Sequence, residues 1–191
     1  DEIYAELTYG RRHVSIASLP GMYERTVVLN GFSKAFAMTG WRMGIAAGPE
    51  DVIFHMNKIH QFTAMSAGTT SQYAALEALE APQRDEEIAA MRKEYNERRL
   101  LMTDGFRKMG LDVTEPEGAF YVFPSIHSTG MGSQEFCSRL LQSKKVAVIP
   151  GDAFGACADG YIRCSYAYSK EMIAECQKRI AEFLREIRHE D

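Results

Sequence analysis

A lysine and an arginine on one short loop are the residues of this chain most suited to chemistry. Lys34 and Arg42 lie in the run Asn30-Gly-Phe-Ser-Lys-Ala-Phe-Ala-Met-Thr-Gly-Trp-Arg-Met-Gly44. A lysine amine attacks carbonyl carbons when it is desolvated, and an arginine guanidinium is the preferred partner of a phosphate. An amine and a phosphate-binding group on one loop are what a site for pyridoxal phosphate needs.

Two short apolar runs flank this loop and would position it. Residues 26–29 and 45–47 are β-branched, aliphatic or small, and glycines bound them. We therefore predict two buried strands. Lys34 would then lie just past the end of a strand, which is where open α/β sheets carry their functional groups.

The run Gly31–Gly44 closely resembles the lysine motif of class I/II pyridoxal-phosphate aminotransferases of fold type I. The resemblance covers essentially the whole chain and implies an α/β fold. Residues 1–95 would belong to the large-domain sheet with its flanking helices, and residues 96–191 would form a small α+β C-terminal domain. We expect the chain to correspond to the C-terminal half of a family member, without the glycine-rich helix start that cradles the phosphate.

The resemblance also assigns roles to residues near the lysine. Lys34 would hold the cofactor as a Schiff base and then, as general base and acid, move a proton from the substrate Cα to the cofactor. Ser33 and Arg42 would hold its phosphate. Asp1 would pair with the pyridine nitrogen and keep the ring an electron sink, while Tyr4 would hydrogen-bond the phenolic oxygen. Because alternation in a strand would put positions 1 and 4 on opposite faces, the chain must leave strand geometry between them.

A second arginine matches the residue that binds the substrate α-carboxylate in this family. Arg163 lies in residues 161–167, and a bidentate fork there would orient the amino acid. The alternative is a strand arginine that extends to the surface. Phe120, Tyr121 and Phe154 resemble residues of the loops around the substrate, although aromatic residues more often form core. One departure is Gly31, where some family members carry a phosphate-binding serine.

Helical periodicity and caps predict the remaining elements. The run Arg92–Arg99 is most simply a solvated helix face with charge pairs at i, i+4, and we place the domain boundary near Asn96. Thr69 is either a helix cap or a contact to the cofactor phosphate of a partner subunit. We expect helices from Gly48, from Thr69, over residues 83–107, from an N-cap at Ser133 and over residues 170–188, with short strands near residues 111–114, 118–124, 146–151 and 161–167.

Composition excludes several classes of protein. The 191 residues are 46% hydrophobic and 25% charged, as in an ordinary soluble protein. The net charge of −4, with acids and bases interspersed, gives no sign of nucleic-acid or membrane binding, and no apolar run approaches the roughly 20 residues of a membrane span. Four cysteines without a CxxC pattern indicate small buried thiols in a reducing cytoplasm and no metal site.

The resemblance implies a transaminase that moves an amino group between an amino acid and a 2-keto acid. Aspartate, aromatic amino acids and acetylated diaminopimelate all fit as substrates, and a homodimer with active sites at its interface is expected. Two other pyridoxal-phosphate enzymes stay open, a C–S lyase and an aminocyclopropane carboxylate synthase. So do a regulator with an aminotransferase-like domain and a fragment without catalytic activity.

Overall fold

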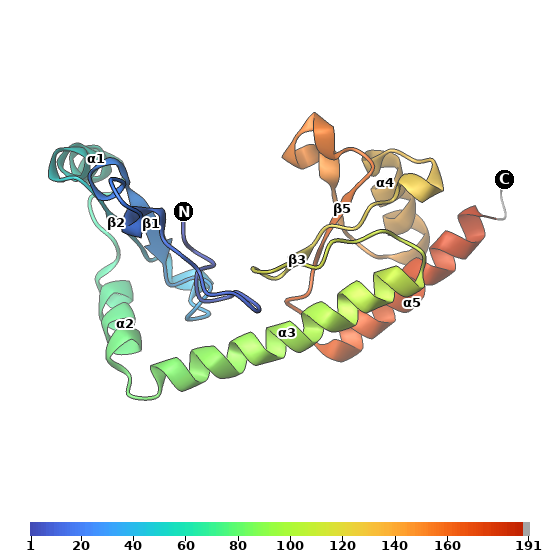
Figure 1. The fold of residues 1–191 in the computed structure, drawn as a ribbon, viewed down its shortest axis with the longest axis horizontal. Coiled ribbons are helices and arrows are strands. Elements are labelled where there is room, and N and C mark those ends of the chain that lie inside the picture. Colours follow the sequence, from blue (N-terminus) through green and yellow to red (C-terminus); the bar gives the residue numbers. More distant parts are fainter. Residues whose placement is uncertain (189–191) are drawn as a thin grey trace. The chain divides into compact units, whose positions relative to one another are not determined.

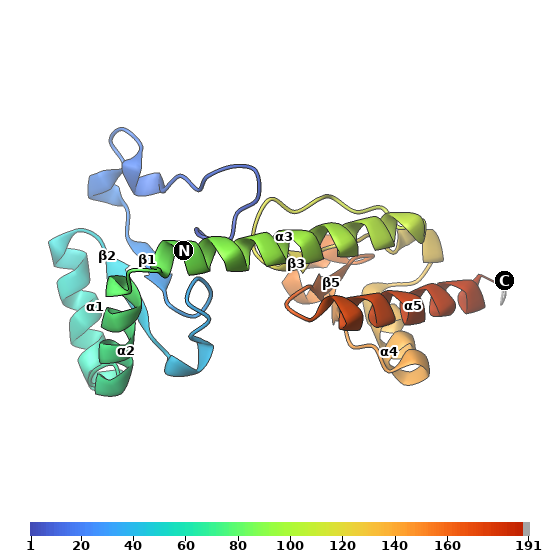
Figure 2. The same ribbon diagram turned by 90° about the horizontal axis from the view of Figure 1, so that it is seen from below.

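The computed structural model describes residues 1–188 and divides into two compact units, residues 1–92 and the residues from 93 onwards (Figures 1 and 2). Each unit contains strands and helices, so the α/β class predicted from the sequence is confirmed. The long helix α3 (Arg84–Lys108) begins in the first unit and ends in the second. The assignment of residues 1–95 and 96–191 to a large and a small domain stays a prediction.

The first unit contains one antiparallel strand pair and two helices. Strands β1 (Val28–Gly31) and β2 (Gly44–Ala47) pair with Val28 opposite Ala47 and Gly31 opposite Gly44. The loop that carries Lys34 joins them. Three short 3-10 turns also belong to this unit, at Ile16–Ser18, Tyr23–Arg25 and Thr39–Trp41.

The prediction that both strands are buried was wrong. All four residues of β2 are exposed, and Ile45 retains 54% of its accessible surface. In β1 only Gly31 is buried. A strand is buried on both faces only when further layers cover it, and no described residue covers β2.

Helices α1 (Glu50–Thr63) and α2 (Thr69–Glu80) follow the strand pair. Glu50 and Asp51 occupy the first turn of α1, where carboxylates favour the positive end of the helix dipole. The N-cap of α2 is Gly68, and Thr69 is the first helical residue, so the prediction of Thr69 as a cap was wrong. Helix α2 packs through Ala75 against the Lys34 loop, in a cluster with Phe32 and Met38.

The second unit is built on a three-stranded antiparallel sheet. The strand order is β3 (Tyr121–Val122), β5 (Ile162–Ser165), β4 (Ile149–Pro150). Helices α4 (Ser133–Lys144) and α5 (Lys170–Ile187) complete the unit with the second part of α3, and both views show α5 running beside α3. Residues 111–114 form no strand, and the other three strands are shorter than predicted. The largest fully buried side chains of this unit are those of Phe106, Ile126, Phe136, Leu140, Ile162, Tyr166, Ile173, Ile180 and Leu184.

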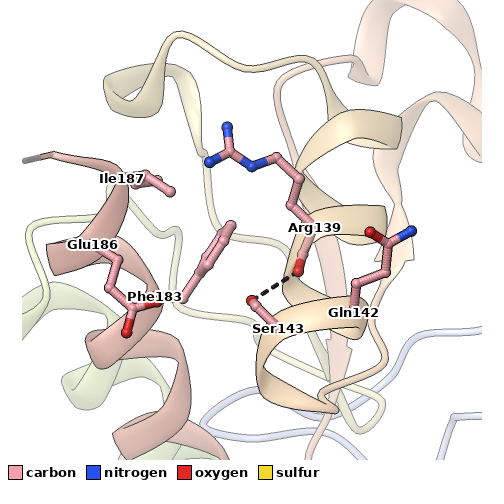
Figure 3. A pocket seen from close by; sticks show the side chains of 6 residues that line it. All are labelled: Arg139, Gln142, Ser143, Phe183, Glu186 and Ile187. Carbon is pink, nitrogen blue, oxygen red and sulfur yellow. Dashed lines mark hydrogen bonds between the residues drawn. The ribbon is translucent and has the colours of Figure 1, made fainter. Parts of the chain in front are cut away.

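Helices α4 and α5 pack against each other and leave a hollow between their surfaces. Phe136 of α4 meets Phe183 of α5 edge-on, with ring centroids 5.2 Å apart. The hollow has a volume of about 330 Å³, and the Ser143 hydroxyl beside it donates to the Arg139 carbonyl at 2.8 Å (Figure 3). Its lining residues are Arg139, Gln142, Ser143, Phe183, Glu186 and Ile187.

Ser133 does not cap α4 as predicted. The N-cap is Gly132, and Ser133 is the first helical residue and fully buried. Its hydroxyl donates to the Tyr161 carbonyl at 2.8 Å and accepts from the Gly160 amide at 2.9 Å. Asp159 supplies the cap from outside the helix, because its Oδ1 accepts from the Ser133 amide at 2.7 Å. The start of α4 is therefore tied to the turn that precedes β5.

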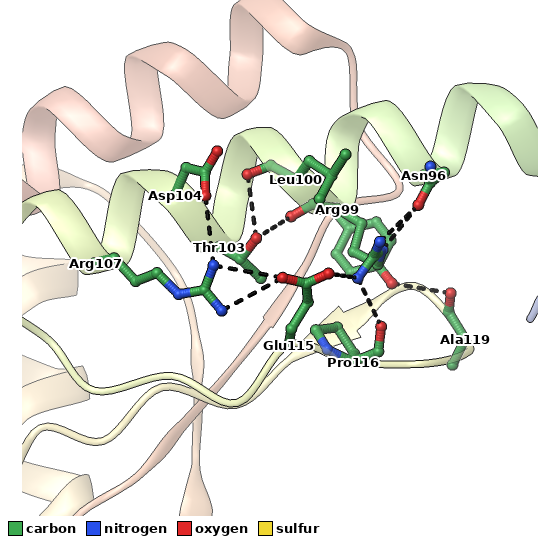
Figure 4. Close-up of polar contacts among 10 residues, drawn as sticks. Asn96, Arg99, Leu100, Thr103, Asp104, Arg107, Glu115, Pro116 and Ala119 are labelled. Atoms are coloured by element: carbon green, nitrogen blue, oxygen red, sulfur yellow. Dashed lines mark hydrogen bonds and ion pairs between the residues drawn. The ribbon is translucent and has the colours of Figure 1, made fainter. Parts of the chain in front are cut away.

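Arg99 is not part of a solvated face. It is 8% exposed, and its Nη1 donates to Glu115 Oε1 at 2.7 Å and to the Pro116 carbonyl at 3.1 Å (Figure 4). Asn96 Oδ1 accepts from Nε and Nη2 of the same arginine. These four hydrogen bonds compensate the cost of burying the Arg99 charge. The other part of the prediction is confirmed, because Arg98 pairs with Glu94 at i, i+4 with a separation of 3.0 Å.

Candidate functional site

The structure brings together two of the residues predicted for the cofactor site. The Lys34 amine lies 5.8 Å from the centroid of the Tyr4 ring, within the range of a cation–π interaction. Both side chains are partly buried. An amine and a phenol at this distance can contact the same small molecule.

Tyr4 lies on a turn. This confirms the prediction that the chain leaves strand geometry between Asp1 and Tyr4. Residues 3–6 have turn geometry, and the Ala5 and Leu7 amides donate to the carbonyls of Glu2 and Tyr4, both at 2.9 Å. The Glu2 amide donates to the Leu29 carbonyl at 2.7 Å, which attaches this segment to β1. Hydrogen bonding along the backbone therefore places Tyr4 beside the strand that leads into the Lys34 loop.

The Lys34 loop is held by its apolar residues. The rings of Phe32 and Phe36 lie 5.1 Å apart, and the Met38 amide returns to the Phe32 carbonyl at 3.2 Å. Ala37 adopts a left-handed conformation with φ 52°. A non-glycine residue in that region marks a turn that the surrounding packing imposes. The loop thus fixes the backbone at Lys34 from both sides.

Gly31, where some family members carry a phosphate-binding serine, lies in a tightly packed part of the first unit. A Cβ at this position would lie 3.0 Å from the Met43 carbonyl oxygen and 3.2 Å from Ile3 Cδ1. A side chain here would therefore require the Met43 carbonyl or the Ile3 side chain to shift by a few tenths of an ångström, which favours glycine at this position.

Asp1, Ser33 and Arg42 each lie in the same unit as Lys34. The Asp1 carboxylate accepts from the Ile3 amide at 3.1 Å. Arg42 is exposed and has φ 53°, and its Nη1 donates to the Thr39 carbonyl at 2.9 Å. That bond orients the guanidinium and leaves its remaining N–H groups open to solvent.

Sequence reasoning missed a contact next to these residues. The Nε2 of His13 lies 3.5 Å from Glu2 Oε1. Hydrogen bonding from Ser15, and then the neighbouring His13, lower the pKa of Glu2. The sequence signal was faint, because neither residue lies in a helix or strand whose periodicity could relate the two positions.

Arg163 lies on β5, the middle strand of the sheet in the second unit. It pairs with Ile149 of β4. Its guanidinium carbon lies 4.4 Å from the centroid of the Tyr121 ring and 4.7 Å from that of Phe154. This guanidinium forms no hydrogen bond or ion pair with any residue between 1 and 188. The prediction that Arg163 binds a carboxylate stays a prediction.

The cysteines are all free, and one of them corrects the expectation of buried thiols. Cys157 is exposed. Burial raises the pKa of the Cys137 thiol to about 11 and raises the pKa of Cys164 well above its usual value. Those two thiols stay protonated and unreactive at neutral pH.

Hollows of the second unit contain none of the predicted site residues. One is the hollow beside α4, and another, of about 490 Å³, lies along α3 and α5. Within residues 1–188 no group of three or more His, Cys, Asp or Glu side chains is arranged to hold a metal ion. In the same part of the chain no helix has the length and apolar character to cross a membrane.

The family of the protein follows from comparison with known sequences. The model of the family described as aminotransferase class I and II matches residues 1–180. The chain therefore belongs to this family.

Individual relatives agree with this assignment. A putative aminotransferase of Bacillus subtilis, YugH, is 53% identical over 184 residues, which are 96% of this chain and 47% of that protein. An aspartate aminotransferase of Pyrococcus abyssi is 46% identical over 97% of this chain and 48% of its own length. The crystal structure of an aromatic aminotransferase from Pyrococcus horikoshii matches with a TM-score of 0.94 at 45% identity, over 97% of this chain and 50% of that one. The chain spans about half the length of the curated relatives that it matches.

Proposed function

We propose that this chain is part of a pyridoxal-phosphate-dependent transaminase that moves an amino group from an amino acid to a 2-keto acid. The observation that carries the proposal is the Lys34 amine 5.8 Å from the Tyr4 ring, on the loop with the family's lysine motif. Membership of the aminotransferase family supports the reaction type.

The side chains around Lys34 fit pyridoxal phosphate by their chemistry. An amine can form a Schiff base with the aldehyde of this cofactor, and a carboxylate can pair with its pyridine nitrogen. A phenol can donate a hydrogen bond to its phenolic oxygen, and a guanidinium together with a hydroxyl can bind its phosphate. Lys34, Asp1, Tyr4, Arg42 and Ser33 supply these groups. All five come from two short segments that the hydrogen bond from Glu2 to Leu29 joins.

Each of these residues then has a separate task. When bound, pyridoxal phosphate supplies a ring that accepts electrons from the Cα–H bond of the amino acid. Lys34 removes the proton from Cα as a general base and, as a general acid, delivers it to the C4′ carbon of the cofactor. Asp1 keeps the ring nitrogen protonated, Tyr4 donates to the phenolic oxygen, and Ser33 with Arg42 binds the phosphate.

Arg163 recognises the substrate. Its guanidinium fork binds the α-carboxylate that every amino acid and 2-keto acid carries. The absence of any hydrogen bond between the Arg163 guanidinium and residues 1–188 supports this role, because its N–H donors stay available. Substrates of the aspartate and aromatic classes are supported by the names of the Pyrococcus relatives. The acetylated diaminopimelate class is supported by the name of a further relative, a probable N-acetyl-LL-diaminopimelate aminotransferase of Bacillus subtilis that is 44% identical over 96% of this chain.

We further infer the assembly and location of the whole protein. It is a cytoplasmic homodimer with active sites at its interface, and Thr69 contacts the cofactor phosphate of the partner subunit. Residues 1–95 belong to the cofactor-binding large domain and residues 96–191 form the small domain. Four free cysteines agree with a reducing compartment.

The test is covalent trapping in the full-length protein. After addition of pyridoxal phosphate, borohydride reduction and peptide mapping should locate the cofactor on Lys34, and Lys34→Ala should abolish both labelling and amino-group transfer while circular dichroism is unchanged. Lys58→Ala, at an exposed lysine of α1, is the matched control and should retain both. Transfer to a keto-acid acceptor separates a transaminase from a lyase or synthase. Labelling without transfer would overturn the reaction, and labelling elsewhere would overturn the site.

A further inference from the structure

Two aromatic rings from different elements meet at one charged group in the second unit. Arg163 of β5 has its guanidinium over the ring of Tyr121 from β3 and over that of Phe154, which ends the turn after β4. The register pairs Tyr121 with Ser165, two residues from Arg163 on the same face of the sheet. Strand pairing therefore fixes the contact with Tyr121.

The two rings hold the charge and leave its donors unused. Ring faces attract a cation within about 6 Å but accept no strong hydrogen bond from its N–H groups. The Arg163 guanidinium has no hydrogen-bond partner among residues 1–188, and no buried side-chain nitrogen or oxygen in this part of the chain lacks one. The guanidinium nitrogens are therefore open to solvent while the group as a whole is anchored.

Further contacts restrain both rings. Phe154 meets Phe123 edge-on with centroids 5.9 Å apart, and Phe123 stacks on Tyr161 at 5.6 Å with an interplanar angle of 14°. On the other side, Tyr121 contacts Phe120 at 4.8 Å, and Phe120 stacks on Tyr95 of α3 at 5.7 Å.

The segment that leads into β3 is pinned as well. Arg99 donates to the Pro116 carbonyl at 3.1 Å, and the hydroxyl of the fully buried Tyr166 donates to the Ala119 carbonyl at 3.1 Å (Figure 4). Ala119 adopts φ 61°, a left-handed turn just before the strand. Hydrogen bonds from α3 and from the residue that follows β5 therefore fix the backbone just before Tyr121.

We propose that Tyr121 and Phe154 are positioning residues that clamp the Arg163 guanidinium and thereby set the affinity for substrates that carry an α-carboxylate. This proposal rests on the proposed function, in which Arg163 binds that carboxylate. An unclamped arginine samples many rotamers, and its side-chain freedom must be lost again when a ligand binds. The clamp removes that cost in advance.

Loss of the clamp should change KM and not kcat. The carboxylate is bound equally in the ground state and in the transition state of proton transfer, so losing the clamp should raise KM and leave kcat nearly unchanged. A cation–π contact of ordinary strength corresponds to a KM increase of about five- to thirty-fold.

The experiment uses five variants of the full-length, cofactor-loaded protein. Tyr121→Leu and Phe154→Leu remove one ring each, while Tyr121→Phe and Phe154→Tyr keep both faces and act as conservative rescues. Tyr168→Leu, at a tyrosine that is 58% exposed, is the control for loss of an aromatic residue. We expect the two leucine variants alone to raise KM for the amino acid and the keto acid about five- to thirty-fold, with kcat within about two-fold of wild type.

Two further measurements separate the clamp from general damage and from the proposed function. An amine substrate without the carboxylate should react equally with all variants. If the leucine variants also lose activity with this amine, or if their KM for the amino acid is unchanged, the clamp is overturned. If the wild type transfers no amino group, the proposed function fails. Calorimetric binding of an α-methyl amino acid, which has the carboxylate but no α proton, then still tests the clamp. Equal affinity in wild type and Tyr121→Leu would refute it.

Discussion

The Arg99 guanidinium in α3 and the Glu115 carboxylate ahead of β3 form an ion pair with an N–O distance of 2.7 Å. Arg107 contributes a longer contact to the second oxygen of the same carboxylate, at 3.4 Å. The pair connects the long helix to the segment that carries Tyr121. It therefore couples helix packing to the surroundings of Arg163 within the second unit.

Replacing Arg99 should destabilise this unit. Arg99→Ala removes hydrogen bonds to Glu115, Asn96 and Pro116, and we expect the free energy of unfolding to fall by about 2–3 kcal/mol. Urea denaturation followed by circular dichroism measures it. Arg92→Ala, an exchange in the same helix at an arginine whose side chain forms no hydrogen bond with residues 1–188, is the control. Equal losses in the two variants would show that the buried pair adds no stability.

Asp159 predicts a dependence of stability on pH. Hydrogen bonds from the backbone amides of Ser133 and Gly160 lower the pKa of this carboxyl in the folded state. A lowered folded pKa gives stability that is present above the unfolded pKa of about 3.9 and is lost as the pH falls through the folded pKa.

Asp159→Asn should therefore lower the melting temperature at pH 7, and the difference from wild type should shrink below about pH 4. Thermal melts from pH 7 to pH 3 provide the measurement. Asp112→Asn, at an exposed aspartate of the same unit, should show no such convergence. A difference that stays constant with pH would mean that the Asp159 charge has no part in capping α4.

A side chain at Gly31 should destabilise the first unit. Gly31→Ala places a methyl group 3.0 Å from the Met43 carbonyl oxygen, so we expect a loss of about 1–3 kcal/mol in unfolding free energy. Gly40→Ala is the matched control, because nothing lies within 4 Å of the position that its methyl group would take. Denaturant titration compares the two. Equal stability of Gly31→Ala and wild type would show that the strand pair can separate to admit a side chain.

Gly105 offers a test of helix packing in which two effects oppose each other. An alanine there would overlap the Gln177 side chain, whose amide donates to the Leu101 carbonyl at 2.9 Å. In the wild-type background the lost hydrogen bond offsets the gain in helix propensity. In a Gln177→Ala background, Gly105→Ala should instead stabilise by about 1 kcal/mol. A double-mutant cycle measures the difference, and identical effects in both backgrounds would exclude the contact.

Arg163→Ala tests the role of Arg163 in binding the carboxylate, independently of the contacts from Tyr121 and Phe154. Losing a bidentate charged contact should raise KM for the amino acid by about 30- to 1,000-fold and leave cofactor binding unchanged. Steady-state kinetics and the visible absorption of the bound cofactor report the two quantities. Arg139→Ala, at the arginine beside the hollow of α4, should leave both as in wild type. An unaltered KM in Arg163→Ala would remove this residue from the carboxylate role.

The sequence by itself determined the family and the helices. The Lys34 run identified the aminotransferases, and α3 was placed within one residue at each end. These features are local, because a motif and a helix depend on residues a few positions apart. The site residues Asp1, Tyr4, Ser33, Lys34, Arg42 and Arg163 were likewise named from motifs.

Only the tertiary structure decided which of these groups meet and which polar residues are buried. Tyr4 lies beside Lys34 because a hydrogen bond to Leu29 attaches the N-terminal segment to β1. The burial of Arg99 depends on its ion pair with Glu115, a residue 16 positions further along the sequence. The aromatic contacts of Arg163 depend on strand register and on a turn beyond β4. Contacts between distant positions arise from packing of whole elements, and no local pattern encodes them.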